Sequence, residues 1–306
     1  MKVAVIGIGS NSVRMLVAAV DGAELRRIRR DREGTRLFAG LDEQSRLSRE
    51  AMRASCAAVK RMADSARAEG CEALHLFATS AARDAANQAD FAALLLEETG
   101  LTLDVCSGER EAALSFLGAT DGGDSGVIDI GGGSTEIIVG QGMKVRCGFS
   151  CQMGAVRLAG LIPIRDHGDL PAVHQYAADI LEDALRPHPT LTFPHTWRGT
   201  GGTFTTLAAM MKGIRWTDRT YMHGTVLTKD AILRIARDLA DLPIEARRLL
   251  PGLQPNRADI IVHGICILLA VMERLKLSEI TVSEYGNLEG YLKYHYLIDA
   301  QKGQAE

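Results

Sequence analysis

The chain has 306 residues, enough for two domains that each bury a core. Apolar residues make up 46% and charged residues 24% of the chain, which is typical of a globular enzyme and excludes a disordered or fibrous protein. The net charge of −3 provides no global field for nucleic acid or an anionic membrane, so neither is expected as a partner. The opening residues are too polar for a signal peptide, and no apolar stretch is long enough to span a membrane. We therefore expect a cytoplasmic protein.

The first half of the chain alternates predicted strands and helices. A strand at residues 3–8 is followed by a turn at 9–12 and a second apolar strand at 13–20. Helical patterns cover 48–68, 87–99 and 108–119, and strand patterns cover 73–79 and 101–106. This alternation predicts an α/β fold with helices on the faces of a sheet. A polar connector at 122–125 predicts a boundary between a first domain, 1–123, and a second domain, 124–306.

The second half repeats this organisation. A strand at 127–130 leads into hairpin strands between 134 and 149, and helices are predicted at 154–160, 169–186, 203–212, 228–240 and 256–277. A strand at 278–283 and a last helix from about residue 286 complete the pattern. Residues 5–12 (VIGIGSNS) align with 127–134 (VIDIGGGS), 122 residues later. A repeated strand–turn–strand unit at this spacing predicts two similar halves.

Three glycine-rich turns, near residues 9, 131 and 200, each follow an apolar strand. Without a Cβ, consecutive N–H groups can point into one concavity and bind phosphate oxygens, although a single such turn can equally be a tight hairpin. Three turns in one chain favour phosphate binding. The first turn lacks the third glycine of a dinucleotide-binding fingerprint, and the chain contains no Gly-Lys-Ser or Gly-Lys-Thr for a P-loop. Six cysteines without CxxC pairs predict reduced thiols rather than a zinc site.

The motifs themselves resemble a known family. In order, they are IGIGSNSVRMLV, FATSAARDAAN, SGEREAALSFLG, VIDIGGGSTEIIV, MGAVRL, GTGGTFTTLA, MHGTVLT, LPGLQPNRADIIVHG and SEYGNLEGYL. Together they resemble the exopolyphosphatase and guanosine pentaphosphate phosphatase family over residues 3–292. The resemblance implies two ribonuclease-H-like domains of the actin-like ATPase superfamily with a cleft between them. It also implies Mg²⁺-assisted hydrolysis of terminal phosphates, a homodimer, and a short form that lacks the C-terminal helical domain of longer members.

The same resemblance assigns roles to acidic residues. Glu111, in SGEREA, is the implied catalytic base that orients the attacking water. From the residues alone, the favoured interpretation is that Glu109 and Glu111 complement the positive end of a helix, and the resemblance reverses this preference. Asp129 lies inside an apolar strand, where a carboxylate is costly without a partner, so we expect it to hold Mg²⁺ or another divalent cation. Glu136 is the second expected metal ligand, with an ordinary strand position as the alternative.

Phosphate binding is expected from polar and cationic side chains near the turns. The candidates are Ser10, Asn11, Ser12, Arg14, Arg83, Gly131, Gly132, Gly133, Ser134 and Thr135. A run of arginines at positions 26, 27, 29, 30 and 32 either widens a positive entry path or protects an exposed strand edge by its charge. His223 and His263 are expected to be structural.

Two positions depart from the family pattern. Gly7 stands where the first motif usually has aspartate, and Leu288 stands where the last motif usually has arginine. We expect altered activity rather than none. The leading hypothesis is exopolyphosphatase activity, and cleavage of the 5′-terminal phosphate of guanosine pentaphosphate is the alternative. A sensor that binds polyphosphate or a phosphorylated guanine nucleotide without hydrolysis, and an actin-like ATPase or sugar kinase, are the rival classes.

Overall fold

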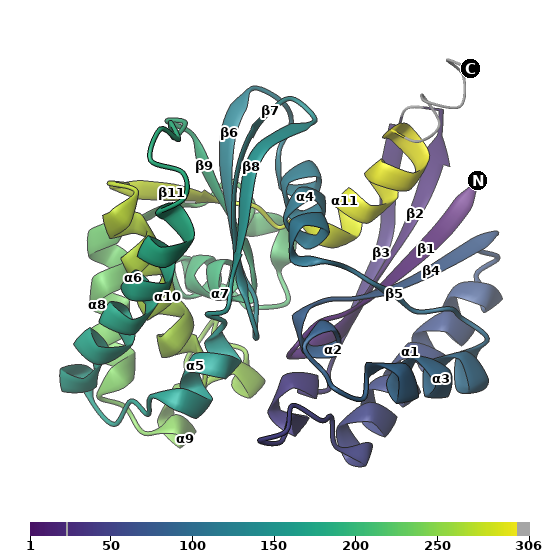
Figure 1. Ribbon diagram of the computed structural model, residues 1–306, viewed down its shortest axis with the longest axis horizontal. Helices are drawn as coiled ribbons and strands as arrows, with labels where there is room; N and C mark the ends of the chain where they lie inside the picture. The colour runs from purple at the N-terminus through teal and green to yellow at the C-terminus, as the bar shows by residue number, and fades with distance from the viewer. Residues whose placement is uncertain (23, 299–306) are drawn as a thin grey trace. The chain divides into compact units, whose positions relative to one another are not determined.

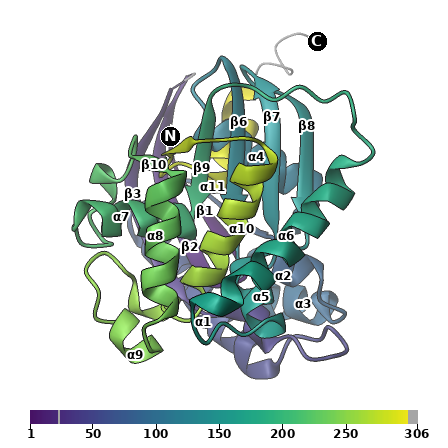
Figure 2. The ribbon, with the colours of Figure 1, turned by 90° about the vertical axis from the view of Figure 1, so that its left-hand side faces the viewer.

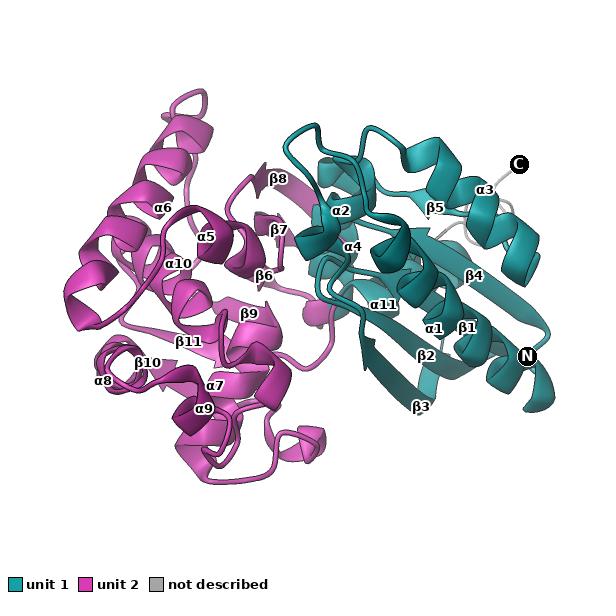
Figure 3. Cartoon of the chain, turned by 90° about the horizontal axis from the view of Figure 1, so that it is seen from below, with its two compact units in different colours: residues 1–118, 287–306 teal, residues 119–286 magenta. Residues whose placement is uncertain are grey.

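The chain folds as two compact units, drawn in different colours in Figure 3, and the computed structural model describes residues 1–22 and 24–298. Among the described residues, unit 1 comprises 1–118 and 287–298, and unit 2 comprises Ala119–Gly286. Each unit contains a mixed sheet and helices, with the strands and helices labelled in Figure 1. The predicted α/β class with two sheet-containing domains is confirmed.

Unit 1 is built on a five-stranded sheet of order β3-β2-β1-β4-β5. Its strands are β1 (Lys2–Ile8), β2 (Ser12–Asp21), β3 (Glu24–Gly34), β4 (Ala73–Ala78) and β5 (Asp104–Val105). Strand β2 is antiparallel to both of its neighbours, β1 and β3, and β1, β4 and β5 run parallel. The central strand β1 is buried on both faces, which explains its almost continuous apolar sequence.

Helices cover both faces of this sheet. Its helices are α1 (Arg49–Ala68), α2 (Ser80–Arg83), α3 (Gln88–Thr99), α4 (Gly108–Ala119) and α11 (Asn287–Lys293), which continues as a π-helix over Tyr294–Ile298. One core lies between the sheet and α1 with α3, and a second core lies on the opposite face with α4 and α11. Ser48 caps α1 by accepting a hydrogen bond from the amide of Ala51, as its position before the helical pattern predicts.

Unit 2 has a six-stranded sheet of order β10-β11-β9-β6-β7-β8. The strands are β6 (Asp124–Ile130), β7 (Thr135–Gln141), β8 (Lys144–Cys151), β9 (Trp197–Gly201), β10 (Val226–Thr228) and β11 (Glu279–Val282). Strands β6, β7 and β8 are antiparallel neighbours, and β6, β9 and β11 run parallel. Five strands of unit 2 thus repeat the order and directions of the unit 1 sheet. The two halves are similar, as the sequence repeat predicts, and their topology is the ribonuclease-H-like one that the family resemblance implies.

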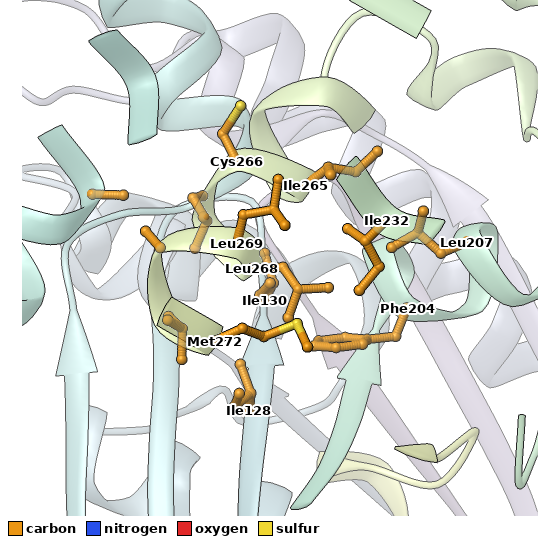
Figure 4. Close-up of a cluster of buried hydrophobic side chains, with 14 of the residues drawn as sticks. Ile128, Ile130, Phe204, Leu207, Ile232, Ile265, Cys266, Leu268, Leu269 and Met272 are labelled. Carbon is orange, nitrogen blue, oxygen red and sulfur yellow. The ribbon is translucent and has the colours of Figure 1, made fainter. Parts of the chain in front are cut away.

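The core of unit 2 lies between its sheet and a layer of helices. These are α5 (Ala155–Leu161), α6 (Leu170–Leu185), α7 (Gly202–Lys212), α8 (Lys229–Ala240), α9 (Ile244–Arg247) and α10 (Ile261–Arg274). Figure 2 shows α8, α10 and α6 side by side in front of the sheet, and Figure 4 shows Leu268 and Met272 of α10 among buried side chains of the other elements. The predicted helix 256–277 is shorter than expected, because residues 255–257 form a separate 3₁₀ turn.

The domain division differs from the predicted one at its C-terminal end. The boundary near residue 123 is close to the observed one at Gly118, but α11 belongs with unit 1, not with the second domain. The physical reason is packing: Leu288 and Leu292 are buried in the unit 1 core, and a Cβ on Gly290 would lie 1.8 Å from the carbonyl oxygen of Leu114. Residues 299–306 of the predicted second domain lie outside the described residues. Within residues 1–22 and 24–298, no helix is long and apolar enough to cross a membrane.

Candidate active site

The first glycine turn joins β1 to β2 and is held rigidly. The amide of Gly9 donates to the carbonyl of Ser12 at 3.0 Å, and the carbonyl of Asn11 accepts from the amides of Thr35 and Arg36 at 3.2 Å. Ser10, Asn11 and Ser12 are all buried, and the side-chain Nδ2 of Asn11 is buried without a hydrogen-bond partner among the described residues. A buried donor without a partner is costly, so this turn presents a donor that a ligand oxygen would satisfy.

The short helix α2 connects this turn to the predicted catalytic glutamate. At its first residue, the hydroxyl of Ser80 shares a 2.9 Å hydrogen bond with the hydroxyl of Ser10. At its last residue, Arg83 donates from Nη1 to Oε2 of Glu111 at 2.9 Å and to the carbonyl of Cys106 at 3.1 Å. The Nη2 atom of Arg83 is buried and has no hydrogen-bond partner in the described structure. The same helix therefore fixes the turn and the carboxylate relative to each other.

Glu111 lies in the first turn of α4 and is only 6% exposed, whereas Glu109 of the same turn is exposed. The hydroxyl of Ser107 accepts from the amide of Arg110 and starts the helix. A glutamate that served only to complement the helix dipole would be expected in solvent, as Glu109 is. The burial of Glu111 against Arg83 therefore favours a role as catalytic base over a role that only complements the helix dipole.

Arg14 lies beside the first turn but also contacts the C-terminal helix of unit 1. Its Nη2 atom would lie 3.6 Å from a Cβ on Gly9, and it donates to Oδ1 of Asn287 at 3.3 Å. Arg14 pairs in register with Gly7 on β1 and with Arg32 on β3, so these three positions share one face of the sheet.

The glycine turn of unit 2 repeats the geometry of the first. The amide of Gly131 donates to the carbonyl of Ser134 at 3.0 Å, as Gly9 does to Ser12 in unit 1. The first amides of α5 donate back to the carbonyls of Gly131 and Gly132, so this helix end is occupied by the turn itself. Gly154 permits the close approach, because a Cβ there would lie 2.3 Å from the carbonyl group of Gly132.

Two residues around this turn have roles that the sequence did not predict. The hydroxyl of Thr135, expected at the phosphate, donates to the carbonyl of Met153 and so connects β7 to the start of α5. Arg157 donates from Nε to the carbonyl of Gly133 at 2.7 Å and brings a cation to the turn. The motif MGAVRL contains Arg157 and is the signal that could have identified it.

The two expected metal ligands are neighbours across the sheet. Asp129 on β6 pairs in register with Glu136 on β7, and the two are 8% and 1% exposed. Thr200 on β9 and Ser150 on β8 extend this line on either side, and the hydroxyl of Ser150 donates to Oε1 of Glu136 at 2.8 Å. We call Thr200, Asp129, Glu136 and Ser150 the acidic row. Two buried carboxylates side by side favour a bound cation, since like charges at this position destabilise the sheet.

The third glycine turn lies next to the acidic row. Gly201 has a φ of +95°, and its missing Cβ leaves room for Oδ1 of Asp129, which would otherwise lie 2.8 Å away. Gly202 begins α7, and the guanidinium of Arg257 lies against it, 1.8 Å from where a Cβ would be. Arg257 is not among the residues predicted for the site, and the motif LPGLQPNRADIIVHG that contains it is the signal for a role at this turn.

The two departures from the family pattern contact each other within unit 1. A Cβ on Gly7 would lie 3.0 Å from Cδ2 of Leu288 and 2.9 Å from Cζ of Phe77. The Phe77 ring stacks on Tyr291 with centroids 4.8 Å apart. Where the family pattern usually has aspartate and arginine, this chain therefore has a closely packed apolar contact.

Other features lie away from these residues. His263 is buried, and its Nε2 atom lies 2.8 Å from the carbonyl oxygen of Ile162; His223 makes an edge contact with the ring of Tyr285. Both environments fit the expected structural role. A cavity of about 780 Å³ in unit 2 lies against α6, α8 and α10, and its lining, which includes His167, Asp241 and Glu273, contains none of the predicted site residues.

The two units share one sheet topology, and each contains a strand–turn–strand element closed by a hydrogen bond from a glycine amide to a serine carbonyl. The protein is therefore an α/β protein of two ribonuclease-H-like units. Exopolyphosphatase 2 of Mycobacterium tuberculosis is 33% identical over 94% of this chain and 97% of that protein. A solved structure of the PPX-GPPA enzyme of Aquifex aeolicus has 30% identity over 95% of this chain and 98% of that chain, with a TM-score of 0.80. An exopolyphosphatase from Cytophaga hutchinsonii, at 24% identity over 98% of each chain, shares the fold with a TM-score of 0.85.

The family model of the Ppx/GppA phosphatase family matches residues 16–297. The chain belongs to this family, and the predicted resemblance is confirmed. It is accordingly an enzyme, a hydrolase of phosphoanhydride bonds.

Proposed function

We propose that this enzyme removes terminal phosphates from inorganic polyphosphate. The observation that carries the proposal is the buried carboxylate of Glu111, which Arg83 holds on the same helix that contacts the first glycine turn through Ser80. A glutamate fixed beside oriented backbone donors is what attack by water on a phosphoryl group requires. The relative from Mycobacterium tuberculosis is an exopolyphosphatase, and this similarity supports polyphosphate as the substrate.

In this proposal Glu111 accepts a proton from water as the water oxygen attacks the terminal phosphorus. The bond from that phosphorus to the bridging oxygen breaks, and the bridging oxygen leaves on a chain shorter by one phosphate. Asn11 Nδ2 and Arg83 Nη2 are two buried donors of unit 1 that would bind phosphate oxygens. The amides of Gly131 to Gly133 would do the same in unit 2.

The proposed cation ligands are Asp129 and Glu136. Among the described residues, no three His, Cys, Asp or Glu side chains gather as a metal cage. Mg²⁺ is usually held by one or two carboxylates with water and substrate phosphates, so the buried pair of the acidic row fits it. When bound, Mg²⁺ supplies neutralisation of the phosphate charge.

The test is release of orthophosphate by the wild-type enzyme from polyphosphate and from guanosine pentaphosphate, separately and in competition. We expect the larger kcat/KM for polyphosphate. A larger kcat/KM for guanosine pentaphosphate would assign the alternative substrate. Tight binding of either substrate by calorimetry with no orthophosphate released would contradict hydrolysis and indicate a sensor.

A further inference from the structure

The arginine run of β3 is divided by the sheet between two faces. Antiparallel pairing places Arg32 opposite Arg14, Arg30 opposite Leu16, and, after a bulge, Arg27 opposite Ala18. Residues directly opposite share a face, and Leu16 and Ala18 belong to the core that packs against α11. Arg14, Arg32, Arg30 and Arg27 therefore follow one another on the α11 face of unit 1.

The other members of the run have a different environment. Arg29 pairs with Asp31 and Glu69, and it donates to the hydroxyl of Ser65 on α1. Arg26 lies opposite Ala19, on the same face as Arg29, and is exposed. The simple alternative, a strand edge protected by charge, describes this face of β3 but not the α11 face.

The arginines of the α11 face begin at the first glycine turn. Arg32 donates from Nε to the hydroxyl of Ser12 at 3.2 Å, and Arg14 lies beside Gly9. Along β3, same-face positions follow at about 6.6 Å for every two residues, with the bulge between Arg30 and Arg27. The guanidinium groups thus continue from the turn that is proposed to bind the terminal phosphates.

Helix α11 holds these arginines partly out of water. Its one carboxylate, Glu289, is 1% exposed and lies 3.3 Å from Nη1 of Arg27 and 3.7 Å from Nη1 of Arg30. The side chains of Arg27 and Arg30 are 24% and 16% exposed. The helix therefore supplies one negative charge to a line of four arginines, and the side chains of Arg27 and Arg30 remain partly accessible to a polyanion.

The same sheet position has the opposite charge in unit 2. The register of unit 1 aligns Phe77, Gly7, Arg14 and Arg32, and the equivalent positions on the corresponding strands of unit 2 are the acidic row. Asp129 and Glu136 lie there 122 residues after Gly7 and Arg14. Since unit 1 lacks the carboxylate there, its face is suited to an anion rather than to a cation.

We propose that Arg14, Arg32, Arg30 and Arg27 form a track that binds the phosphates behind the terminal one, and so give the enzyme a preference for long polyphosphate. This inference rests on the proposed function. A chain with a charge on every phosphate contacts several guanidinium groups at once, whereas tripolyphosphate reaches only the turn. Glu289 competes with the substrate for Arg27 and Arg30.

The test compares Arg27→Gln/Arg30→Gln with Arg26→Gln, a variant of the same strand and residue type on the other face. We expect kcat/KM for long-chain polyphosphate to fall about tenfold or more in the double variant, and its dependence on salt to weaken. Hydrolysis of tripolyphosphate should stay within about twofold of the wild-type rate, and Arg26→Gln should match the wild type on both substrates. The proposed track would be refuted if Arg27→Gln/Arg30→Gln lost as much kcat/KM on tripolyphosphate as on long-chain polyphosphate. It would also be refuted if Arg26→Gln lowered kcat/KM as much as the double variant does.

A second variant separates binding from folding. Glu289→Gln removes the competing charge, so we expect tighter binding of long polyphosphate by calorimetry, whereas a purely structural role of Glu289 would leave that affinity unchanged or weaken it. Circular dichroism checks that each variant is folded. If the wild type hydrolyses neither long nor short polyphosphate, the proposed function fails. The track can then still be tested by calorimetry, because an affinity of Arg27→Gln/Arg30→Gln for long polyphosphate equal to that of the wild type would refute it.

Discussion

The contact between Gly7 and Leu288 predicts a specific coupling in stability. A Cβ added at Gly7 would lie 2.9 Å from Phe77 and 3.0 Å from Leu288, closer than side chains normally pack. Overpacking of this kind lowers the free energy of unfolding by about 1–3 kcal/mol. Replacing a strand glycine by alanine raises it again by about 0.5–1 kcal/mol, because glycine loses more conformational freedom on folding. We expect Gly7→Ala to lower the free energy of unfolding of unit 1 by about 1 kcal/mol.

Shortening Leu288 relieves the crowding. Leu288→Ala alone leaves a cavity and should lower the unfolding free energy by about 2–5 kcal/mol. In that background the space the leucine has left can take up both the methyl group of Gly7→Ala and a small shift of the Phe77 ring away from it, so the effect of Gly7→Ala should be near zero. The double variant should therefore be more stable than the sum of the singles predicts, by about 1 kcal/mol.

The assay must follow unit 1. Both tryptophans, Trp197 and Trp216, lie in unit 2, so tryptophan fluorescence follows the wrong unit. Urea unfolding by circular dichroism, with native-state hydrogen exchange of the β1 amides, measures the relevant free energy. The control pair combines Gly7→Ala with Leu95→Ala, since Leu95 is buried on the opposite face of the sheet. Additive effects in the Gly7–Leu288 pair, within about 0.5 kcal/mol, would refute the compensating contact.

Three further predictions concern single residues. Arg83→Met should lower kcat for orthophosphate release by about tenfold or more with the fold intact by circular dichroism, because Glu111 loses its 2.9 Å partner; an unchanged kcat would contradict that role. Burial lowers the pKa of His263 below its usual 6.5, so the unfolded state takes up the proton first and stability falls as pH drops below about 6.5, by at most about 1.4 kcal/mol per pH unit. Urea unfolding of His263→Gln at pH 7.5 and 5.5 should show a smaller difference than the wild type, and an equal difference would oppose this assignment. Asp129→Asn should raise the Mg²⁺ concentration needed for half-maximal hydrolysis by about tenfold or more, and an unshifted Mg²⁺ titration would exclude Asp129 as a ligand.

Local sequence patterns predicted much of the fold. The repeat of VIGIGSNS and VIDIGGGS predicted two strand–turn–strand elements, and both turns close with the same glycine amide to serine carbonyl hydrogen bond. The return of α11 to unit 1 could not be predicted from chain order, because it depends on the packing of Gly290 and Leu288 in a core formed by residues far away in the sequence.

The candidate site was predictable where a motif contains its residues, and less so where it depends on register. Glu111 and Arg83 were chosen separately, but their contact depends on how α2 and α4 pack. Ser80, three residues before Arg83, was missed because its role is visible only from its hydrogen bond to Ser10. The separation of the β3 arginines between two faces depends on a bulge, and no periodicity in the sequence predicts it.

The most direct test of the proposed mechanism is a ³¹P NMR time course with polyphosphate of defined length, comparing the wild type with Glu111→Gln. We expect the wild type to release orthophosphate as the only early product, with chains shortened one phosphate at a time, and the variant to bind the same polyphosphate with almost no release. Orthophosphate release by Glu111→Gln at the wild-type rate, or early cleavage inside the chain by the wild type, would contradict terminal hydrolysis by a water that Glu111 orients.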